Sequence, residues 1–200
     1  HVRIAAYAAL AQLGDASHVD FLAEKTASTK GEEQKAARDS LYRLRGEQVD
    51  KKILAGIAKA DPKLKIELIH AVAERNITTG ADLLWKLARG SDSEVRVESV
   101  KALRAIAGER QLPELIGLVI YAKTEADRAE AENTVAAVAR KIEDKDKRPE
   151  AILAVLPSVA DVTAKCSLIN VLGKIGADSS FPALHKALAE QNSSVKYAVV

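Results

Sequence analysis

The residues that could carry chemistry are few and scattered along the chain. Cys166 is the one thiol, and the four histidines are His1, His18, His70 and His185. A metal site needs several such ligands at short spacings, and a nucleophile needs a base beside it. The sequence has no His-x-x-x-His pair, no Gly-x-Ser-x-Gly motif and no glycine-rich phosphate loop. It therefore predicts no catalytic residue, no metal and no cofactor, with Cys166 an inert helical cysteine and a reactive thiol as the alternative.

Charge and aromatic content weigh against two kinds of partner. The chain has 30 Lys and Arg against 28 Asp and Glu, a formal net charge of +2, and only 4% aromatic residues. A nucleic-acid interface needs a basic face or a base-stacking platform, so we expect no nucleic-acid partner. The longest uncharged run, residues 151–160, is much shorter than the ~18 residues of a membrane span. No targeting signal is visible, so the localisation is not indicated.

The elements that must position any site follow from an internal repeat. A frame of an apolar residue and a basic one, with further apolar residues eight and eleven positions later, recurs along the chain. It begins near residues 2, 33, 64, 95, 127, 164 and 195, at spacings of 31, 31, 31, 32, 37 and 31 residues. A fixed period of this length is typical of stacked supersecondary units, each unable to bury its apolar face alone.

Each frame predicts a helix with one apolar stripe. Offsets 0, +4, +8 and +11 lie on one helical face, and small residues at +4 and +7, such as Ala6 and Ala9, allow close helix packing. Helix-capping residues stand three positions before most frames: Asp61, Asp92, Thr124, Asp161 and Asn192, with Lys30 the exception. Shorter apolar segments between the frames predict a second helix in each repeat, over residues 17–27, 49–60, 81–89, 112–122, 148–156 and 181–189.

This pattern resembles the HEAT-repeat family, in particular the short bacterial HEAT-like repeats of the phycobilisome bilin-lyase type. The resemblance lies in starts such as Asp92-Ser93-Glu94-Val95-Arg96 and in endings such as Ala102 to Gly108 and Val171 to Gly176. It implies an all-α fold, a right-handed α-solenoid of six helix pairs plus a partial seventh, in one array over residues 1–200. It also implies that the frame helices line the concave face. Four residues in repeats two and five depart from the pattern: Glu33, Arg38, Asp127 and Glu132.

A basic residue follows the first position of six of the seven frames. The ladder consists of Arg3, Lys65, Arg96, Arg128, Lys165 and Lys196, with Gln34 as its interruption. One interpretation is a stripe that binds phosphate or an acidic partner. The resemblance favours the other, in which each cation bonds a carboxylate or loop carbonyl of the neighbouring repeat. We therefore expect a structural inter-repeat ladder.

The solvent face of the frame helices is predicted at offsets +3, +6 and +10. Its charge is mixed, with acidic residues at +3 in the middle three repeats. The candidate partner-binding strip consists of Glu67, Glu98, Glu130, His70, Lys101 and Asn133. Such a strip fits a protein or peptide of basic character, and ordinary solvated helix surface is the alternative interpretation.

Two further features have open interpretations. Residues 140–148 are charged at eight of nine positions and coincide with the one long spacing, so we expect a longer solvated connection, with a binding loop as the alternative. Trp85, in the segment Leu83 to Leu87, is expected to pack between repeats, with an exposed interaction anchor as the alternative.

The sequence favours a non-enzymatic protein-interaction scaffold that presents an extended concave surface, as a module of a larger bacterial protein. The chain starts and stops within helical patterns, so we expect it to be a fragment of that protein. One alternative is a repeat domain that assists or is fused to an enzyme, either bilin-lyase-like or linked to a hydrolase. The second, disfavoured by the mixed charge, is a nucleic-acid-binding HEAT-like domain. Fold alone does not decide among these functions.

Overall fold

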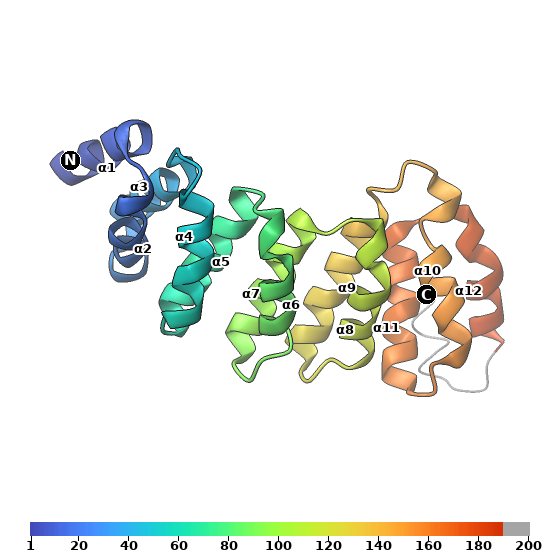
Figure 1. Ribbon diagram of the computed structural model, residues 1–200. Coiled ribbons are helices and arrows are strands. Elements are labelled where there is room, and N and C mark those ends of the chain that lie inside the picture. The colour runs from blue at the N-terminus through green and yellow to red at the C-terminus, as the bar shows by residue number, and fades with distance from the viewer. Residues whose placement is uncertain (190–200) are drawn as a thin grey trace. The chain divides into compact units, whose positions relative to one another are not determined.

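The computed structural model describes residues 1–189, and within this range every regular element is helical, with no strands (Figure 1). The all-α prediction is therefore confirmed. The helices are α1 (Val2–Leu13), α2 (Val19–Ser28), α3 (Gly31–Arg43), α4 (Val49–Lys59), α5 (Pro62–Glu74), α6 (Ala81–Leu87), α7 (Ser93–Ile106), α8 (Leu112–Ile120), α9 (Glu125–Ala139), α10 (Glu150–Val155), α11 (Val162–Ile175) and α12 (Phe181–Leu188). Long and short helices alternate, and each long helix starts within a few residues of a repeat frame.

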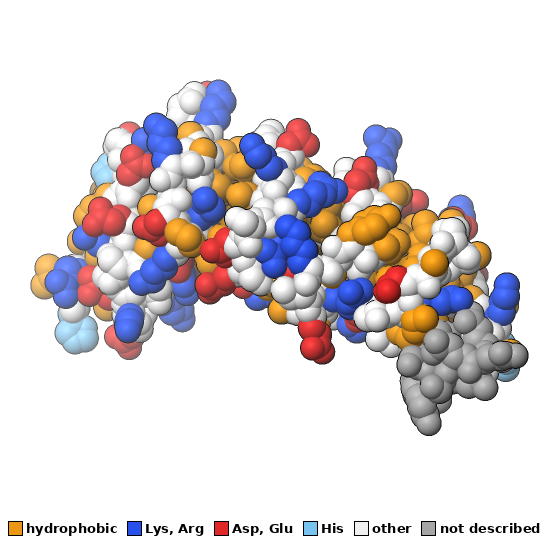
Figure 2. All heavy atoms as spheres, turned by 90° about the horizontal axis from the view of Figure 1, so that it is seen from below, with side chains coloured by type: hydrophobic (Ala, Val, Ile, Leu, Met, Phe, Trp, Pro, Cys, Tyr) orange, Lys and Arg blue, Asp and Glu red, His pale blue; other side chains and the backbone are white. Residues whose placement is uncertain are grey.

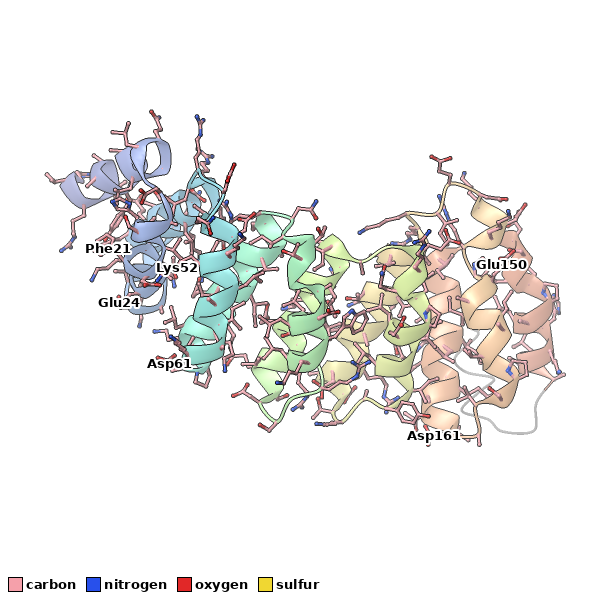
Figure 3. All side chains as sticks on the ribbon, in the orientation of Figure 1. Phe21, Glu24, Lys52, Asp61, Glu150 and Asp161 are labelled. Atoms are coloured by element: carbon pink, nitrogen blue, oxygen red, sulfur yellow. The ribbon has the colours of Figure 1, made fainter. Side chains whose placement is uncertain are left out.

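Side-chain caps begin the long helices where the sequence places them. The carboxylates of Asp61 and Asp161 accept hydrogen bonds from the backbone N–H three residues later, at 3.0 and 2.7 Å, and both residues stand at the start of their helices (Figure 3). Asp92 does the same at 2.9 Å, and Thr124 forms a reciprocal capping box with Asp127. These bonds satisfy N–H groups that have no partner inside the helix. The predicted cap Asn192 lies outside the described residues.

The chain divides into two compact units, residues 1–106 and residues 107–200, which are described separately. In the first unit, α3 packs on the short helix α2 that precedes it, α5 packs on α4, and α7 packs on α6. Consecutive long helices also pack on one another, α1 on α3, α3 on α5 and α5 on α7. The unit therefore consists of a layer of long helices against a layer of short ones.

The second unit is built around α9, which packs on both α8 and α11. Helix α8 also contacts α11 and α10. Helix α10 has only six residues and continues into a 3₁₀ turn at Leu156–Ser158. The long spacing between frames is thus taken up by the connection between α9 and α10.

Both cores contain the predicted apolar stripe of the long helices, together with apolar side chains of the short helices such as Ile53 and Leu115. At offset +8 of α3, α5, α7, α9 and α11 the side chains are at most 1% exposed: Leu41, Val72, Leu103, Val135 and Leu172. The small residues at +7 are also buried in these helices, as with Ala71 and Ala102. Helix α1 differs, because Ala6 and Ala9 are exposed and Val2 and Leu13 are 85% and 86% exposed. The stripe of α1 has the same sequence pattern, but of its positions Val2, Ala6, Leu10 and Leu13 only Leu10 is partly buried.

Candidate functional site

Two open grooves lie between successive long helices of the first unit. The groove between α1 and α3 has a volume of about 750 Å³, and its lining includes Ile4, Ala8, Ala11, Gln12, Asp39 and Arg43. The groove between α5 and α7 has a volume of about 580 Å³, and its lining includes Tyr42, His70, Glu74, Glu98, Lys101 and Ala105. Offsets +6 and +10 of the repeat contribute residues to both grooves. These predicted solvent-facing positions therefore lie on the hollowed part of the surface.

Glu67, the first acid of the predicted strip, does not face solvent. It is 5% exposed, and both of its carboxylate oxygens accept hydrogen bonds from the Arg38 guanidinium, with Nε 2.7 Å from Oε2. The fork of donors matches the two oxygens, which makes this the strongest kind of charge-assisted pair. The prediction of a solvent-exposed Glu67 is corrected here, because Arg38 on α3 draws the carboxylate inward between α3 and α5.

Glu98 is held by two cations at the edge of the α5–α7 groove. Its Oε2 lies 2.9 Å from His70 Nε2 on α5, and its Oε1 lies 2.6 Å from Lys101 Nζ one turn along α7. Burial alone would raise the pKa of Glu98, but the hydrogen bonds from Lys101 and His70 outweigh it and hold the pKa below its ordinary value. Three members of the predicted strip thus form one bonded cluster that joins α5 to α7.

Tyr42 forms a partly buried wall of the same groove. Burial, reinforced by the negative charge of Glu67, raises the pKa of Tyr42 to about 12. The phenol is therefore neutral over the physiological range and offers a hydrogen-bond donor and acceptor. The groove combines this neutral ring with the exposed charges of Glu74 and Lys101 at its border.

The remaining strip residues belong to the second unit. Asn133 is exposed, and its Oδ1 accepts a hydrogen bond from Lys174 Nζ on α11 at 2.9 Å. Lys174 also bonds Glu132 Oε2 at 2.9 Å, which joins α9 to α11. Glu130 is half-buried and lies 3.5 Å from the Thr134 hydroxyl. The structure therefore brings together Glu98, His70 and Lys101 and places Glu130 and Asn133 on another unit.

Three members of the basic ladder contact neighbouring segments. Arg3 Nε lies 3.0 Å from Glu33 Oε1 on α3. Arg96 is 5% exposed and donates to the Ser91 and Gly90 carbonyls after α6, at 2.7 and 3.3 Å. Arg128 donates to the Val119 carbonyl of α8 at 3.1 Å. Lys65 and Lys165 are half-buried, and Lys196 lies outside the described residues.

Gln34, the interruption of the ladder, performs the same task as Arg96 and Arg128. Its Nε2 donates to the Thr26 carbonyl in the last turn of α2, at 2.7 Å. At Gln34, Arg96 and Arg128 this position therefore donates to carbonyls at or just after the end of the preceding short helix, and Gln34 does so without a positive charge. Sequence reasoning missed this because it followed the charge and not the donor group.

Three of the residues that depart from the pattern bond to a neighbouring long helix. Glu33 accepts from the Tyr7 hydroxyl at 3.1 Å, Arg38 binds Glu67, and Glu132 binds Lys174. The sequence signal was present, since charged residues stood at positions where other repeats are apolar. Their partners could not be identified, because several opposite charges lie one repeat away on each side.

The charged segment 140–148 is bonded at several points to neighbouring turns. Lys141 Nζ donates to the Ala107 carbonyl at 2.9 Å, Arg148 Nε donates to the Ile142 carbonyl at 2.9 Å, and Arg140 donates to the Lys174 carbonyl. The carbonyl of Asp146 accepts from the Ser179 hydroxyl at 2.8 Å. Burial lowers the pKa of Lys141 from its ordinary value. The segment is thus an ordered connection within the second unit.

The other singled-out residues occupy intermediate positions. Trp85 is half-buried, with the Arg89 guanidinium 5.5 Å from the centre of its ring, and Cys166 is also half-buried. In the described part of the chain no three His, Cys, Asp or Glu side chains are grouped so that they could hold a metal ion. No described helix is both long and apolar enough to cross a bilayer. Acidic and basic side chains are interspersed on the face shown in Figure 2.

The comparison with known proteins finds likeness among solved structures and none at the level of sequence families. No family model matches the chain, and no curated protein matches its sequence. Among solved structures, the chain is similar to an engineered protein that was a target of the Northeast Structural Genomics Consortium. The two share 20% sequence identity over 90% of this chain and 93% of the other, with a TM-score of 0.49.

Proposed function

We propose that the chain is a HEAT-like array of helix pairs, a right-handed solenoid, that serves as a non-enzymatic scaffold for a protein or peptide partner. Support for the array comes from recurrence within the first unit, where each of three short helices packs on the long helix that follows it. The Gln34 and Arg96 bonds to the preceding segment recur at the same offset, 62 residues apart. Repeated nearest-neighbour contacts of this kind are the basis of solenoid stability.

The observation that carries the binding function is the pair of grooves between long helices. Both are hollows of several hundred cubic ångströms with an alanine-rich floor and charged residues at the border. Ala8 and Ala105 are exposed, so a partner side chain can approach the helix backbone closely there. A groove with a small-residue floor is a surface on which an extended or helical peptide can lie.

We propose that the partner contacts the residues lining the grooves, and not the acidic strip that the sequence predicted. Glu67 and Glu98 already have cationic partners on neighbouring helices, so a basic ligand would have to displace Arg38 or His70. Glu74 at the border is exposed and offers a negative charge, and Lys101 is exposed as well, with its Nζ paired to Glu98. The ligand therefore gains its affinity from side chains that fill the groove, with the border charges fixing its register.

The test places a bulky side chain in one groove at a time, at positions that are exposed and therefore not part of the core. Peptides are selected from a displayed library on the immobilised chain, and their affinities are measured for Ala8→Trp, Ala105→Trp and Ala58→Trp. All three alanines are exposed, but Ala58 lies on the short helix α4, outside both grooves. The proposal expects about a tenfold loss of affinity or more with one of the first two variants and no loss with the third. Equal affinities for all three variants would contradict it.

A further inference from the structure

The groove between α5 and α7 is lined by one carboxylate that no described residue pairs. Glu74, in the last turn of α5, is exposed, and its carboxylate makes no ion pair or hydrogen bond to the described residues. Glu98 differs, because Lys101 and His70 bond its two oxygens at 2.6 and 2.9 Å. Arg104, also in the lining, is half-buried and makes interactions of its own within the chain. A ligand in this groove therefore meets a free negative charge at Glu74, and its complement is a cation.

Tyr42 is a second group of the same groove with an unused polar atom. Its ring is half-buried, and its hydroxyl makes no hydrogen bond to the described residues. Burial raises the pKa of Tyr42 to about 12, and the negative charge of Glu67 reinforces this, with smaller contributions in the same direction from Glu74 and Asp39. Arg38 opposes them, but less strongly than Glu67 acts. The charges around the phenol thus disfavour a further negative charge and favour a positive one.

The floor of the groove leaves room for a long side chain. Its small residues are Ala73, Ala102 and Ala105, of which Ala105 is exposed, and the groove has a volume of about 580 Å³. An arginine side chain has an apolar stem that can lie on such a floor. Its planar guanidinium can stack on an aromatic ring and still donate to a carboxylate, whereas lysine offers only a point charge. Arginine is therefore the cation that suits both Tyr42 and Glu74.

We propose that the α5–α7 groove binds an arginine side chain of the partner, with the guanidinium on the Tyr42 ring and bonded to the Glu74 carboxylate. The stem of the arginine lies on the alanine floor. This inference rests on the proposed function, because it names the chemistry of the residue that enters one of the two grooves. It assigns charge recognition to Glu74 and not to the strip acids Glu67 and Glu98, whose carboxylates already have cationic partners.

The probe is the peptide acetyl-Ala-Ala-Arg-Ala-Ala-amide, added to the whole chain labelled with ¹⁵N. The control peptide has citrulline in place of arginine, which keeps the shape of the side chain and removes its charge. Binding is followed by the backbone amide NMR signals of residues 70–74 and 101–105. We expect saturable shifts of these signals, with binding of the arginine peptide tighter by about threefold or more. Nuclear Overhauser effects should join the arginine δ protons to the Tyr42 ring.

Two matched variants test the assignment to Glu74. Glu74→Gln should weaken binding of the arginine peptide by about threefold and leave the citrulline peptide unchanged, so that the two peptides bind alike. Glu94→Gln removes the same charge from an exposed acid at the start of α7, outside the groove lining, and should change neither peptide. Equal binding of the two peptides to the unaltered chain, or equal effects of the two variants, would overturn the proposal. Absence of saturable shifts would overturn it as well.

Failure of this inference is distinguishable from failure of the groove function. Library peptides that lose affinity with Ala105→Trp, but whose binding ignores Glu74→Gln, would support a peptide groove and overturn arginine recognition. Library peptides indifferent to both groove-filling tryptophans would contradict the groove function itself, and the arginine proposal with it.

Discussion

The guanidinium of Arg38 on α3 donates two hydrogen bonds to the buried carboxylate of Glu67 on α5. The two residues are 29 positions apart in the sequence. The bond joins two consecutive long helices of the first unit, and the Glu67 side chain is only 6% exposed. A carboxylate this deep is tolerated because both of its oxygens accept from one cation. Arg38 stands at an offset where other repeats have an apolar residue, and its two parallel bonds to Glu67 constrain how the two helices align.

Removing one partner of this pair should cost more than removing both. Arg38→Ala leaves Glu67 buried without its donors, and we expect the free energy of unfolding to fall by about 2 to 3 kcal/mol. In the double variant Arg38→Leu with Glu67→Leu, much of that loss should be recovered. Urea unfolding of the two single leucine variants and the double variant forms the mutant cycle. Strictly additive effects would show that the two side chains are not coupled.

The cluster around Glu98 should make the first unit sensitive to acid. The pKa of Glu98 is lower in the folded chain than its ordinary value, so the carboxylate adds stability above that ordinary value. This stability is lost as the pH falls through the lowered folded pKa. Glu98→Gln should therefore unfold with a weaker pH dependence between about pH 5 and pH 3. Thermal unfolding over this range measures it, and Glu94→Gln, an exposed acid at the start of the same helix, is the control.

Two glycines of α11 should respond in opposite directions to the same substitution. Gly176 ends the helix in the left-handed region, at φ 68°, so Gly176→Ala should lower stability by about 1 kcal/mol. Gly173 lies inside the helix, and an added methyl group would meet nothing within 4 Å, so Gly173→Ala should raise stability by about 0.5 to 1 kcal/mol. Urea unfolding compares the two variants. Equal destabilisation by both would show that the helix does not end at Gly176.

An array of repeats should tolerate the loss of one whole repeat. Deleting residues 64–94 removes one period of 31 residues and moves Glu98 into the position of Glu67, facing Arg38. Because contacts in a solenoid are between neighbours, we expect unchanged helicity per residue by circular dichroism and a cooperative transition. Deleting only residues 64–78 breaks the period and should lower helicity per residue. Equal loss in both deletions would contradict the array.

The helices could be predicted from sequence because their signals are local. Caps such as Asp61 and stripes such as Leu41 to Leu44 act within a few residues, and the structure shows both where expected. The Arg38–Glu67 pair and the exposure of the α1 stripe could not be predicted in this way. Both depend on which segments lie alongside, and Ala6 has the same local pattern as Ala37 although only Ala37 is buried.

The sequence predicted which helical face lines the candidate site. It did not predict which charged groups on that face already have partners. Offsets +6 and +10 do line the grooves, as the helical period requires. At offset +3 the helical period predicted a solvent-facing side chain. Glu67 at this offset instead points toward α3, where it binds Arg38. The ladder position was identified by its charge, whereas Gln34, Arg96 and Arg128 share a side-chain donor that bonds a carbonyl.

The hydrogen bonds of the 140–148 segment affect how easily a protease can cleave the chain there. Five of its nine residues are Lys or Arg, the residues after which trypsin cleaves. Three of these side chains hold backbone carbonyls, and the segment's own Asp146 carbonyl is held by Ser179. A protease must pull a stretch of chain into an extended form before cleavage, and here that means breaking these bonds first. The most charged stretch of the chain is therefore a poor boundary for truncated versions.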